Sequence, residues 1–339
     1  MSSPSRPAQL AAEARPLGDG VYRIALPLPF PSPQAVNCYL FEGDRGATLL
    51  DCGIDGPEEF DMLNRAMAGF GFAVSDLHRL VASHLHVDHM GMAKRIINST
   101  GCEWVMHNST KAEVPHYNNW SPRRDELARL VASTGAPPEA VTRFGRGFAR
   151  PAWFSEALPP THPVEDGDRL PLSTGRHLEV IFTPGHQANH LCLRDSRTGR
   201  LFSGDHVLPR ISPFIPYTGE GEDHLGAYLG SLDRIIRLEA GGTYPGHGPT
   251  IERGSARAHQ ILLHHQRRLE TMLGILTEGA RAPWDIMQAV FRSNLSPLEE
   301  RLAFQETMAH LEHLRRKGRV ERYLVDGLWH YRRLAANEP

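Results

Sequence analysis

The chain has 339 residues, a length that suggests about two domains. Hydrophobic residues make up 40% and charged residues 22% of the chain, which is close to the average of globular proteins and excludes wholesale disorder. A formal net charge of -2 excludes a polycation built to bind nucleic acid. Mean hydropathy is -0.37 and no run of about 18 apolar residues exists, so no membrane-spanning helix is expected.

The N-terminus and the cysteines bear on the compartment. Residues 1–16 contain no continuous apolar block, so no secretory signal is expected. The four cysteines form no CxxC pair, which argues against a disulfide framework and favours a reducing compartment. They are Cys38, Cys52, Cys102 and Cys192. We therefore expect a cytoplasmic protein, whose most unusual feature is its 19 histidines.

The N-terminal half alternates between two kinds of pattern. Residues 1–20, rich in Ser, Pro and Ala, predict a flexible tail. Short apolar runs and stretches with helical spacing then follow in turn. The predicted strands lie at 21–24, 37–41, 47–50 and 80–82, and the predicted helices at 57–69 and from 93 onward. Strands that alternate with helices indicate an α/β layered domain, which we place at 21–254.

Residues 111–165 interrupt the alternation. Two stretches, 125–133 and 138–148, have helical character and are followed by several prolines. We interpret the segment as a helical insertion over one rim of the sheet, and its aromatic residues are candidate walls of a substrate pocket. These aromatic residues are Tyr117, Trp120, Trp153 and Phe154. Strands are predicted again at 178–182, 191–194, 201–202 and 243–244.

A different pattern begins after residue 254. Helices are predicted at 258–277, 284–291 and 296–317, the last opened by a favourable Ser-Pro cap. Two short strands then flank Asp326-Gly327, a strong hairpin turn. Three helices and a hairpin predict a compact winged-helix-like C-terminal domain over 255–335.

One short segment is rich in metal-ligating side chains. Ser83-His84-Leu85-His86-Val87-Asp88-His89 follows an apolar strand and precedes a helix. Alternation in an extended segment places His84 and His86 on the same side. Asp88 and His89 then lie at the turn into the helix and point elsewhere. Two pairs of ligands within six residues suit two adjacent metal ions better than one.

Three later fragments repeat the arrangement of a strand, a glycine and one ligand. They end in Gly185-His186, Gly204-Asp205 and Gly246-His247, and the glycine allows the backbone to turn sharply where the strand ends. Together with the first segment they supply five imidazoles and two carboxylates. The full set is His84, His86, Asp88, His89, His186, Asp205 and His247. Such nitrogen and oxygen donors suit zinc, with manganese or iron as alternatives.

These motifs resemble the metallo-β-lactamase-fold hydrolase superfamily, whose signature is HxHxDH followed by a distant His, Asp and His. The resemblance covers about residues 21–251 and implies a four-layer αβ/βα sandwich with the site on one edge. It also implies how two metal ions share the seven ligands: the first on His84, His86 and His186, the second on Asp88, His89 and His247, with Asp205 bridging them. Asp51 matches the aspartate that supports the ligands in this family.

The charge of such a site indicates its chemistry. Two divalent cations, two carboxylates and a bridging hydroxide leave one net positive charge, which favours an anionic transition state. Metal ions also lower the pKa of bound water, so hydroxide exists at neutral pH. Asp88 is the expected catalytic residue besides being a ligand. We expect a binuclear zinc hydrolase that uses a metal-bridging hydroxide on a small carbonyl substrate, such as a thioester, an ester or a lactone.

Two other functions stay open. The C-terminal domain resembles the winged-helix appendage of the β-lactamase-like endoribonuclease branch, which suggests an endoribonuclease or phosphodiesterase. The other alternative is a non-enzymatic regulatory protein that binds metal. A basic cluster ends the last predicted helix, at Arg315, Arg316, Lys317 and Arg319. Four glutamates along the same helix would repel phosphates, so we favour a structural or dimerising role for this domain over nucleic-acid binding. No membrane partner is expected.

Several other polar residues are given supporting roles. His190 and His206 flank ligands and are expected to support them. No metal is assigned to the histidines of the C-terminal helices, among them His264 and His265. The proton donor to the leaving group is open among His206, Tyr217 and a metal-bound water.

Overall fold

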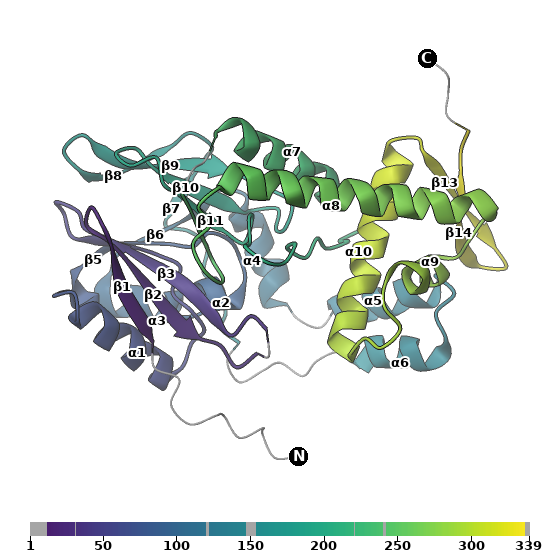
Figure 1. Cartoon of the computed structure of the whole chain (residues 1–339). Coiled ribbons are helices and arrows are strands. Elements are labelled where there is room, and N and C mark those ends of the chain that lie inside the picture. Colours follow the sequence, from purple (N-terminus) through teal and green to yellow (C-terminus); the bar gives the residue numbers. More distant parts are fainter. Residues whose placement is uncertain are drawn as a thin grey trace.

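The computed structural model describes residues 12–30, 32–119, 122–146, 154–219, 221–239 and 242–335, and in this part of the chain two β-sheets lie face to face between layers of helices (Figure 1). The first sheet has seven strands in sequence order. They are β1 (Glu13–Gly18), β2 (Val21–Pro27), β3 (Ala35–Phe41), β4 (Ala47–Leu50), β5 (Leu77–Val81), β6 (Glu103–His107) and β7 (His162–Val164). The second sheet has five strands in the order β12-β11-β10-β9-β8. They are β8 (Arg169–Ser173), β9 (Arg176–Phe182), β10 (Leu191–Asp195), β11 (Leu201–Gly204) and β12 (Thr243–Pro245).

The sequence of β3 explains why both faces of the first sheet are buried. Successive side chains of a strand point to opposite faces, so an unbroken apolar run supplies two cores. Cys38 and Leu40 belong to the core beneath the outer helices. Tyr39 and Phe41 belong to the core between the sheets, where their rings meet Phe202 of β11 edge-on with centroids 5.0 and 4.8 Å apart.

Helices cover the outer face of each sheet, which confirms the four-layer α/β sandwich. Over the first sheet lie α1 (Pro57–Ala68) and α3 (Ala93–Thr100), which bury Met67 and Ile96 against it. Over the second sheet lie α7 (His224–Arg237) and the first half of α8 (Gly254–Ile275). A single helical turn, α2 (Val87–Met90), follows β5 and the loop after it. None of the described helices combines the length and the apolar character needed to cross a membrane.

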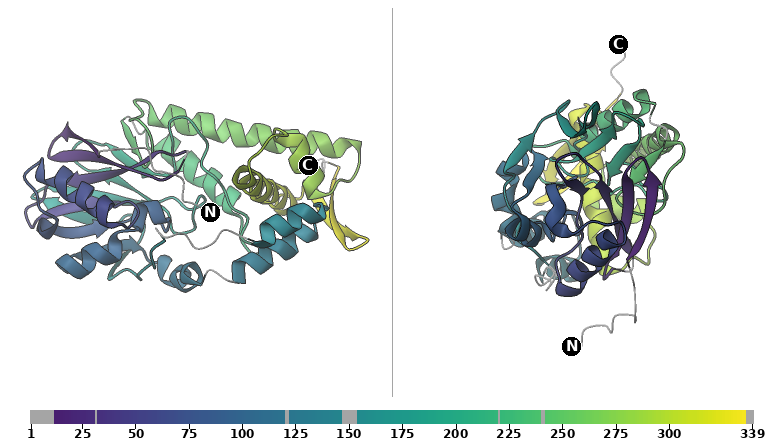
Figure 2. Two further views of the ribbon diagram at one scale, coloured as in Figure 1. Left: turned by 90° about the horizontal axis from the view of Figure 1, so that it is seen from below. Right: turned by 90° about the vertical axis from the view of Figure 1, so that its left-hand side faces the viewer.

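The C-terminal part extends the molecule away from the sandwich (Figure 2). Helix α8 runs from the second sheet to this part, which also contains α9 (Pro283–Val290), α10 (Pro297–Arg316), β13 (Val320–Val325) and β14 (Leu328–Arg333). Three helices followed by a hairpin are the predicted order. Ser296 and Glu299 form the predicted reciprocal cap of α10, and Asp326 and Gly327 have the positive φ angles, 50° and 79°, of a tight hairpin turn. The winged-helix character and the boundary at 255 stay predictions.

The predicted insertion contains three helices, α4 (Thr110–Asn118), α5 (Pro122–Ala132) and α6 (Pro138–Arg146). In place of lying only over the rim of a sheet, α5 and α6 pack on the C-terminal helices. Phe144 of α6 lies edge-on to Phe304 of α10 with centroids 5.5 Å apart, and Trp284 of α9 completes the cluster. Tyr117 and Phe154 stack on each other with centroids 5.1 Å apart, whereas Trp120 and Trp153 lie outside the described residues. The insertion therefore ties the C-terminal part to the sandwich.

Candidate metal centre

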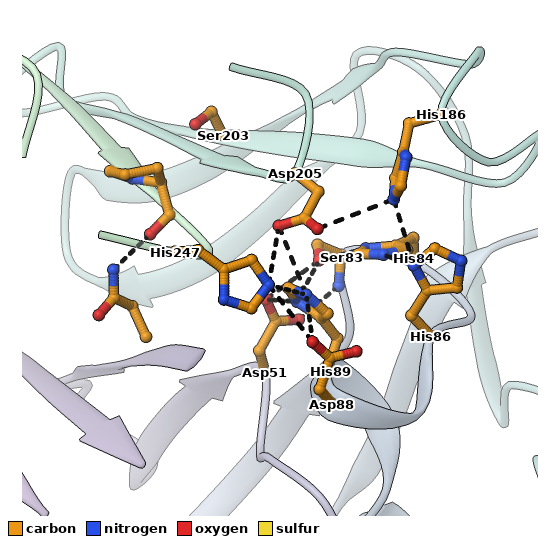
Figure 3. Close-up of polar contacts among 12 residues, drawn as sticks. Asp51, Ser83, His84, His86, Asp88, His89, His186, Ser203, Asp205 and His247 are labelled. Atoms are coloured by element: carbon orange, nitrogen blue, oxygen red, sulfur yellow. Dashed lines mark hydrogen bonds and ion pairs between the residues drawn. The ribbon is translucent and has the colours of Figure 1, made fainter. Parts of the chain in front are cut away.

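All seven predicted ligands converge at one edge of the sandwich, where strands of both sheets end (Figure 3). The loop after β5 and the first turn of α2 supply four of them, and the ends of β9, β11 and β12 supply one each. Their side chains form two groups, and within each group the candidate ligand atoms lie within 4.8 Å of one another. The first group is His84, His86, His186 and Asp205, and the second is Asp88, His89 and His247.

The second group has the size of a tetrahedral metal site. The Nε2 atoms of His89 and His247 are 3.3 Å apart. Asp88 Oδ2 lies 3.3 Å from His247 Nε2, and Asp205 Oδ1 lies 3.4 Å from the same atom. Zinc binds such atoms at about 2.0–2.1 Å, so tetrahedral ligands stand about 3.3–3.4 Å from one another. These four atoms therefore fit one divalent ion.

Asp205 also belongs to the first group, and this makes the two groups one site. Its Oδ1 faces His247, whereas its Oδ2 lies 3.8 Å from His186 Nε2 (Figure 3). In the first group His86 Nδ1 lies 2.8 Å from His84 Nε2 and 3.2 Å from His186 Nε2. One carboxylate thus presents a different oxygen to each group, as a bridging ligand does.

Backbone carbonyls orient two of the imidazoles. His186 Nδ1 donates to the carbonyl of Phe214 at 2.7 Å, and His247 Nδ1 donates to the carbonyl of Ala35 at 2.7 Å. Because a carbonyl can only accept, each ring carries a proton on Nδ1 and turns its Nε2 toward the site. Both histidines are therefore held in the ring orientation in which Nε2 can bind a metal ion.

Asp51 orients a third imidazole, as the resemblance implied. His89 Nδ1 donates to Asp51 Oδ2 at 2.8 Å, while Ser83 donates to the same carboxylate through its backbone N–H at 2.7 Å and its hydroxyl at 3.0 Å. Asp51 has a φ of 60°, in the left-handed region that non-glycine residues seldom adopt. Such strain persists where surrounding contacts demand it, and here the contacts are those with Ser83 and with the candidate metal ligand His89.

Opposite charges in the second group perturb its titration. Burial alone would lower the pKa of His247, but Asp205 and Asp88 outweigh burial and raise it to about 10. Burial alone would raise the pKa of Asp88, but His89 and His247 lower it to about 2. The two carboxylates therefore attract positive charge to this point, whether a proton or a metal ion.

The histidines of the first group are uncharged and ready to bind a metal ion as neutral imidazoles. Burial, assisted by the neighbouring His186, lowers the pKa of His86 to about 3. Burial is also the main cause that lowers the pKa of His84 well below its usual value. Neutral imidazoles bind metal ions without first losing a proton.

Two of the glycines allow the ligands to approach closely. A Cβ atom on Gly246 would lie 2.6 Å from Asp205 Oδ1 and 2.7 Å from His89 Cε1. Gly204 has a φ of 46°, and a Cβ there would meet the Ser83 side chain at 2.8 Å. Gly246 thus leaves room for Asp205 and His89, and Gly204 leaves room for Ser83.

The candidate ligands differ in their exposure to solvent. His86 and Asp88 are half-buried, whereas the other five ligands are buried. The more exposed ligands of the site therefore lie on the loop that links β5 to α2 and on the first turn of α2.

The predicted supporting histidines differ in their roles. His190 Nε2 accepts from the backbone N–H of Asp205 at 3.1 Å, and its Nδ1 bonds to Thr183 Oγ1 at 2.8 Å, so it supports Asp205. His206 is fully buried with its ring edge-on to Tyr228, at a centroid separation of 5.0 Å. Its burial among other side chains does not favour it as the proton donor to a leaving group.

Sequence reasoning missed some groups that hold the ligands. The side-chain amide of Gln187 lies 2.6 Å from His86 Nε2, so it fixes the ring that presents Nδ1 to the site. Its place next to His186 in the chain was a usable signal. The carbonyls of Ala35 and Phe214 gave none, because every residue carries a carbonyl.

Comparisons with known proteins agree with this geometry. Residues 31–247 match the family model of the metallo-beta-lactamase superfamily. Residues 269–334 match that of the metallo-beta-lactamase-like C-terminal domain. The probable metallo-hydrolase YqjP of Bacillus subtilis (strain 168) is 26% identical over 314 residues, which cover 90% of this chain and 95% of that protein. The beta-lactamase-like protein 2 homolog of Caenorhabditis elegans is 27% identical over 292 residues, covering 85% of this chain and 81% of the relative.

Solved structures show the same arrangement over nearly the whole chain. The crystal structure of a metallo-beta-lactamase family protein from Thermus thermophilus has a TM-score of 0.77 and 28% identity, and the match covers 94% of this chain and 100% of that one. A beta-lactamase domain protein from Burkholderia ambifaria, at 24% identity and a TM-score of 0.79 over 97% of both chains, shares the fold. The protein therefore belongs to the metallo-β-lactamase superfamily and is one of its metallo-hydrolases.

Proposed function

We propose that the enzyme holds two zinc ions and hydrolyses a small carbonyl substrate, namely a thioester, an ester or a lactone. The position of Asp205 supports the proposal of two ions, because its two oxygens face two separate ligand groups. Imidazole and carboxylate donors at tetrahedral spacing favour zinc, with manganese or iron as the alternatives.

The protein contributes charge, orientation and access. A pair of divalent ions bound there supplies Lewis acidity and an activated water at neutral pH. Asp88 and Asp205 provide two negative charges, too few to cancel two divalent cations, so the site favours an anionic transition state. The side chain of Asp88 is 14% exposed, so one of its oxygens can hold the second ion while the other orients the attacking water and accepts its proton.

The surface charge of the C-terminal domain supports a small substrate over RNA. Arg315 of the predicted basic cluster donates to Glu312 at 2.8 Å, and Arg319 lies 3.9 Å from Glu270. Arg322 also pairs with Glu312, at 3.3 Å. Cations that already have carboxylate partners offer less attraction to a phosphate backbone.

Turnover by the zinc-loaded enzyme tests the proposal. A panel of thioesters, esters and lactones should include at least one substrate whose hydrolysis is lost in the chelated enzyme and restored by zinc. Labelled single-stranded RNA is the matched alternative substrate. Cleavage of RNA without turnover of any thioester, ester or lactone would show that the enzyme acts on phosphodiesters and not on carbonyl substrates. Purified protein with no bound transition metal would contradict the two-ion site itself.

Dimerisation through the C-terminal domain and a cytoplasmic location stay predictions. Sedimentation of the purified chain tests the first, and cell fractionation tests the second.

A further inference from the structure

A loop that follows the bridging ligand also holds another ligand in place. Residues 206–218 connect Asp205 at the end of β11 to the segment before α7. Within this loop the carbonyl of Phe214 accepts the hydrogen bond from His186 Nδ1 at 2.7 Å. The position of this loop therefore determines the orientation of His186, one of the candidate ligands of the first group.

Helix α8 holds this loop by hydrogen bonds to its backbone and to one side chain. Arg257 donates to the carbonyl of Leu208 at 2.7 Å and to the carbonyl of Ile211 at 3.0 Å. Two turns further along α8, His265 Nε2 lies 2.9 Å from the hydroxyl of Ser212. His265 is fully buried, so this contact is made without competition from bulk water.

His265 is itself fixed from α10. Its Nδ1 lies 3.1 Å from His310 Nε2, and His310 Nδ1 donates to the carbonyl of Glu306 at 2.7 Å. Since His310 carries its proton on Nδ1, its Nε2 accepts from His265 Nδ1–H, and His265 Nε2 accepts from the Ser212 hydroxyl. Burial lowers the pKa of His265 to about 2 and that of His310 to about 3, so both rings are neutral, as this chain of bonds requires.

The same side chains could in principle form a third metal site. Candidate ligand atoms of His265, Glu306 and His310 lie within 4.8 Å of one another. However, both nitrogens of each ring already have hydrogen-bond partners, and the carboxylate of Glu306 is paired with Arg268. A site whose donors are satisfied and whose carboxylate is neutralised has little to offer a cation, so the hydrogen-bond chain is the better assignment.

We propose that His265 is a positioning residue of the metal centre: through Ser212 it fixes the loop whose Phe214 carbonyl orients His186. This inference rests on the proposed two-metal function. It gives the C-terminal domain a role in the site, because His310, which fixes His265, lies within the part of the chain that matches the C-terminal family model. The helices α8 and α10 thus act on the first metal ion without touching it.

Four single variants and one double variant test the proposal in the full-length enzyme. His265→Leu and Ser212→Ala each break the contact, and His265→Gln keeps an amide that can accept from Ser212 and donate to His310. His264→Leu is the matched control, because His264 is the adjacent residue of α8 and is exposed. The readouts are the affinity of each metal ion in chelator competition and the visible absorption spectrum of the cobalt-substituted enzyme, with circular dichroism as the check of folding.

We expect His265→Leu and Ser212→Ala each to lower the affinity for one of the two ions about tenfold, which is the lower end of the effect of removing a group that orients a ligand. Both variants should also shift the cobalt spectrum. The double variant, His265→Leu with Ser212→Ala, should bind this ion no more weakly than either single variant, because the two substitutions remove the same interaction. His265→Gln should recover most of the affinity, and His264→Leu should match the wild type.

Two results would overturn the proposal while leaving the two-metal function intact. One is a folded Ser212→Ala enzyme with wild-type affinities and spectrum. The other is a third bound ion that disappears in His265→Leu, which would make these residues a metal site. A wild-type enzyme that binds no metal would instead overturn the proposed function and this inference together.

Discussion

Replacing Asp51 by asparagine is a sharp test of how the second metal ligand group is built. The carboxylate of Asp51 accepts from the backbone N–H of Ser83 through Oδ1 and from His89 Nδ1 through Oδ2. In Asp51→Asn the amide oxygen must stay on the Ser83 N–H, because two N–H groups cannot face each other. The amide NH₂ then faces His89 Nδ1. This imidazole is forced to carry its proton on Nε2, the atom that faces the metal site.

The structure also indicates that this variant folds. Asparagine has the same shape as aspartate and adopts the left-handed region more readily than most residues, which suits the φ of 60° at this position. The expected loss is therefore one of metal affinity. Removing a group that fixes a ligand tautomer costs about 10- to 100-fold in affinity, or about 1.4–2.7 kcal/mol, and it should affect one ion of the two.

Chelator competition monitored ion by ion is the assay, with metal content after dialysis as the second measurement. Asp55→Asn is the matched control, because Asp55 is a nearby aspartate that pairs with Arg95 at 2.7 Å and faces no ligand. The control should bind both ions like the wild type. An Asp51→Asn enzyme that keeps both affinities would refute the argument from tautomers. An equal loss of affinity for both ions would show that Asp51 supports the whole edge of the sandwich.

Three further predictions concern the same centre. Asp205→Asn should reduce the metal content from two ions to one or none by elemental analysis, because one atom of the amide is a poor ligand. Gly246→Ala should lower the Tm and the metal content, since its Cβ would lie 2.6 Å from Asp205 Oδ1 and overpacking of this kind costs about 1–3 kcal/mol; unchanged unfolding would contradict it. In the metal-free enzyme His247 has its pKa raised to about 10, so a metal ion must displace its proton at pH 7. Metal affinity should therefore rise with pH towards 10, and calorimetry in two buffers should detect the proton that is released.

The candidate metal ligands could be predicted from the sequence because each is marked locally. His84, His86, Asp88 and His89 follow a buried strand within six residues, and each of the other three ligands follows a strand-ending glycine. Strands that end at the same edge of two facing sheets bring their following residues together. The hydrophobic alternation that defines the strands therefore also defines where the ligands meet.

The groups that orient the ligands were decided only by the tertiary structure. Ala35 and Phe214 act through their carbonyls, which are the same in every residue, and the partner of each lies far away in the chain. The packing of α5 and α6 against the C-terminal helices was also decided only by the tertiary structure. An apolar stripe determines which face of a helix is buried, but the shape of the surrounding elements determines which neighbour covers it. For the same reason the sequence indicated only that His265 is one of two adjacent histidines on a helix, and the fold alone placed it against Ser212.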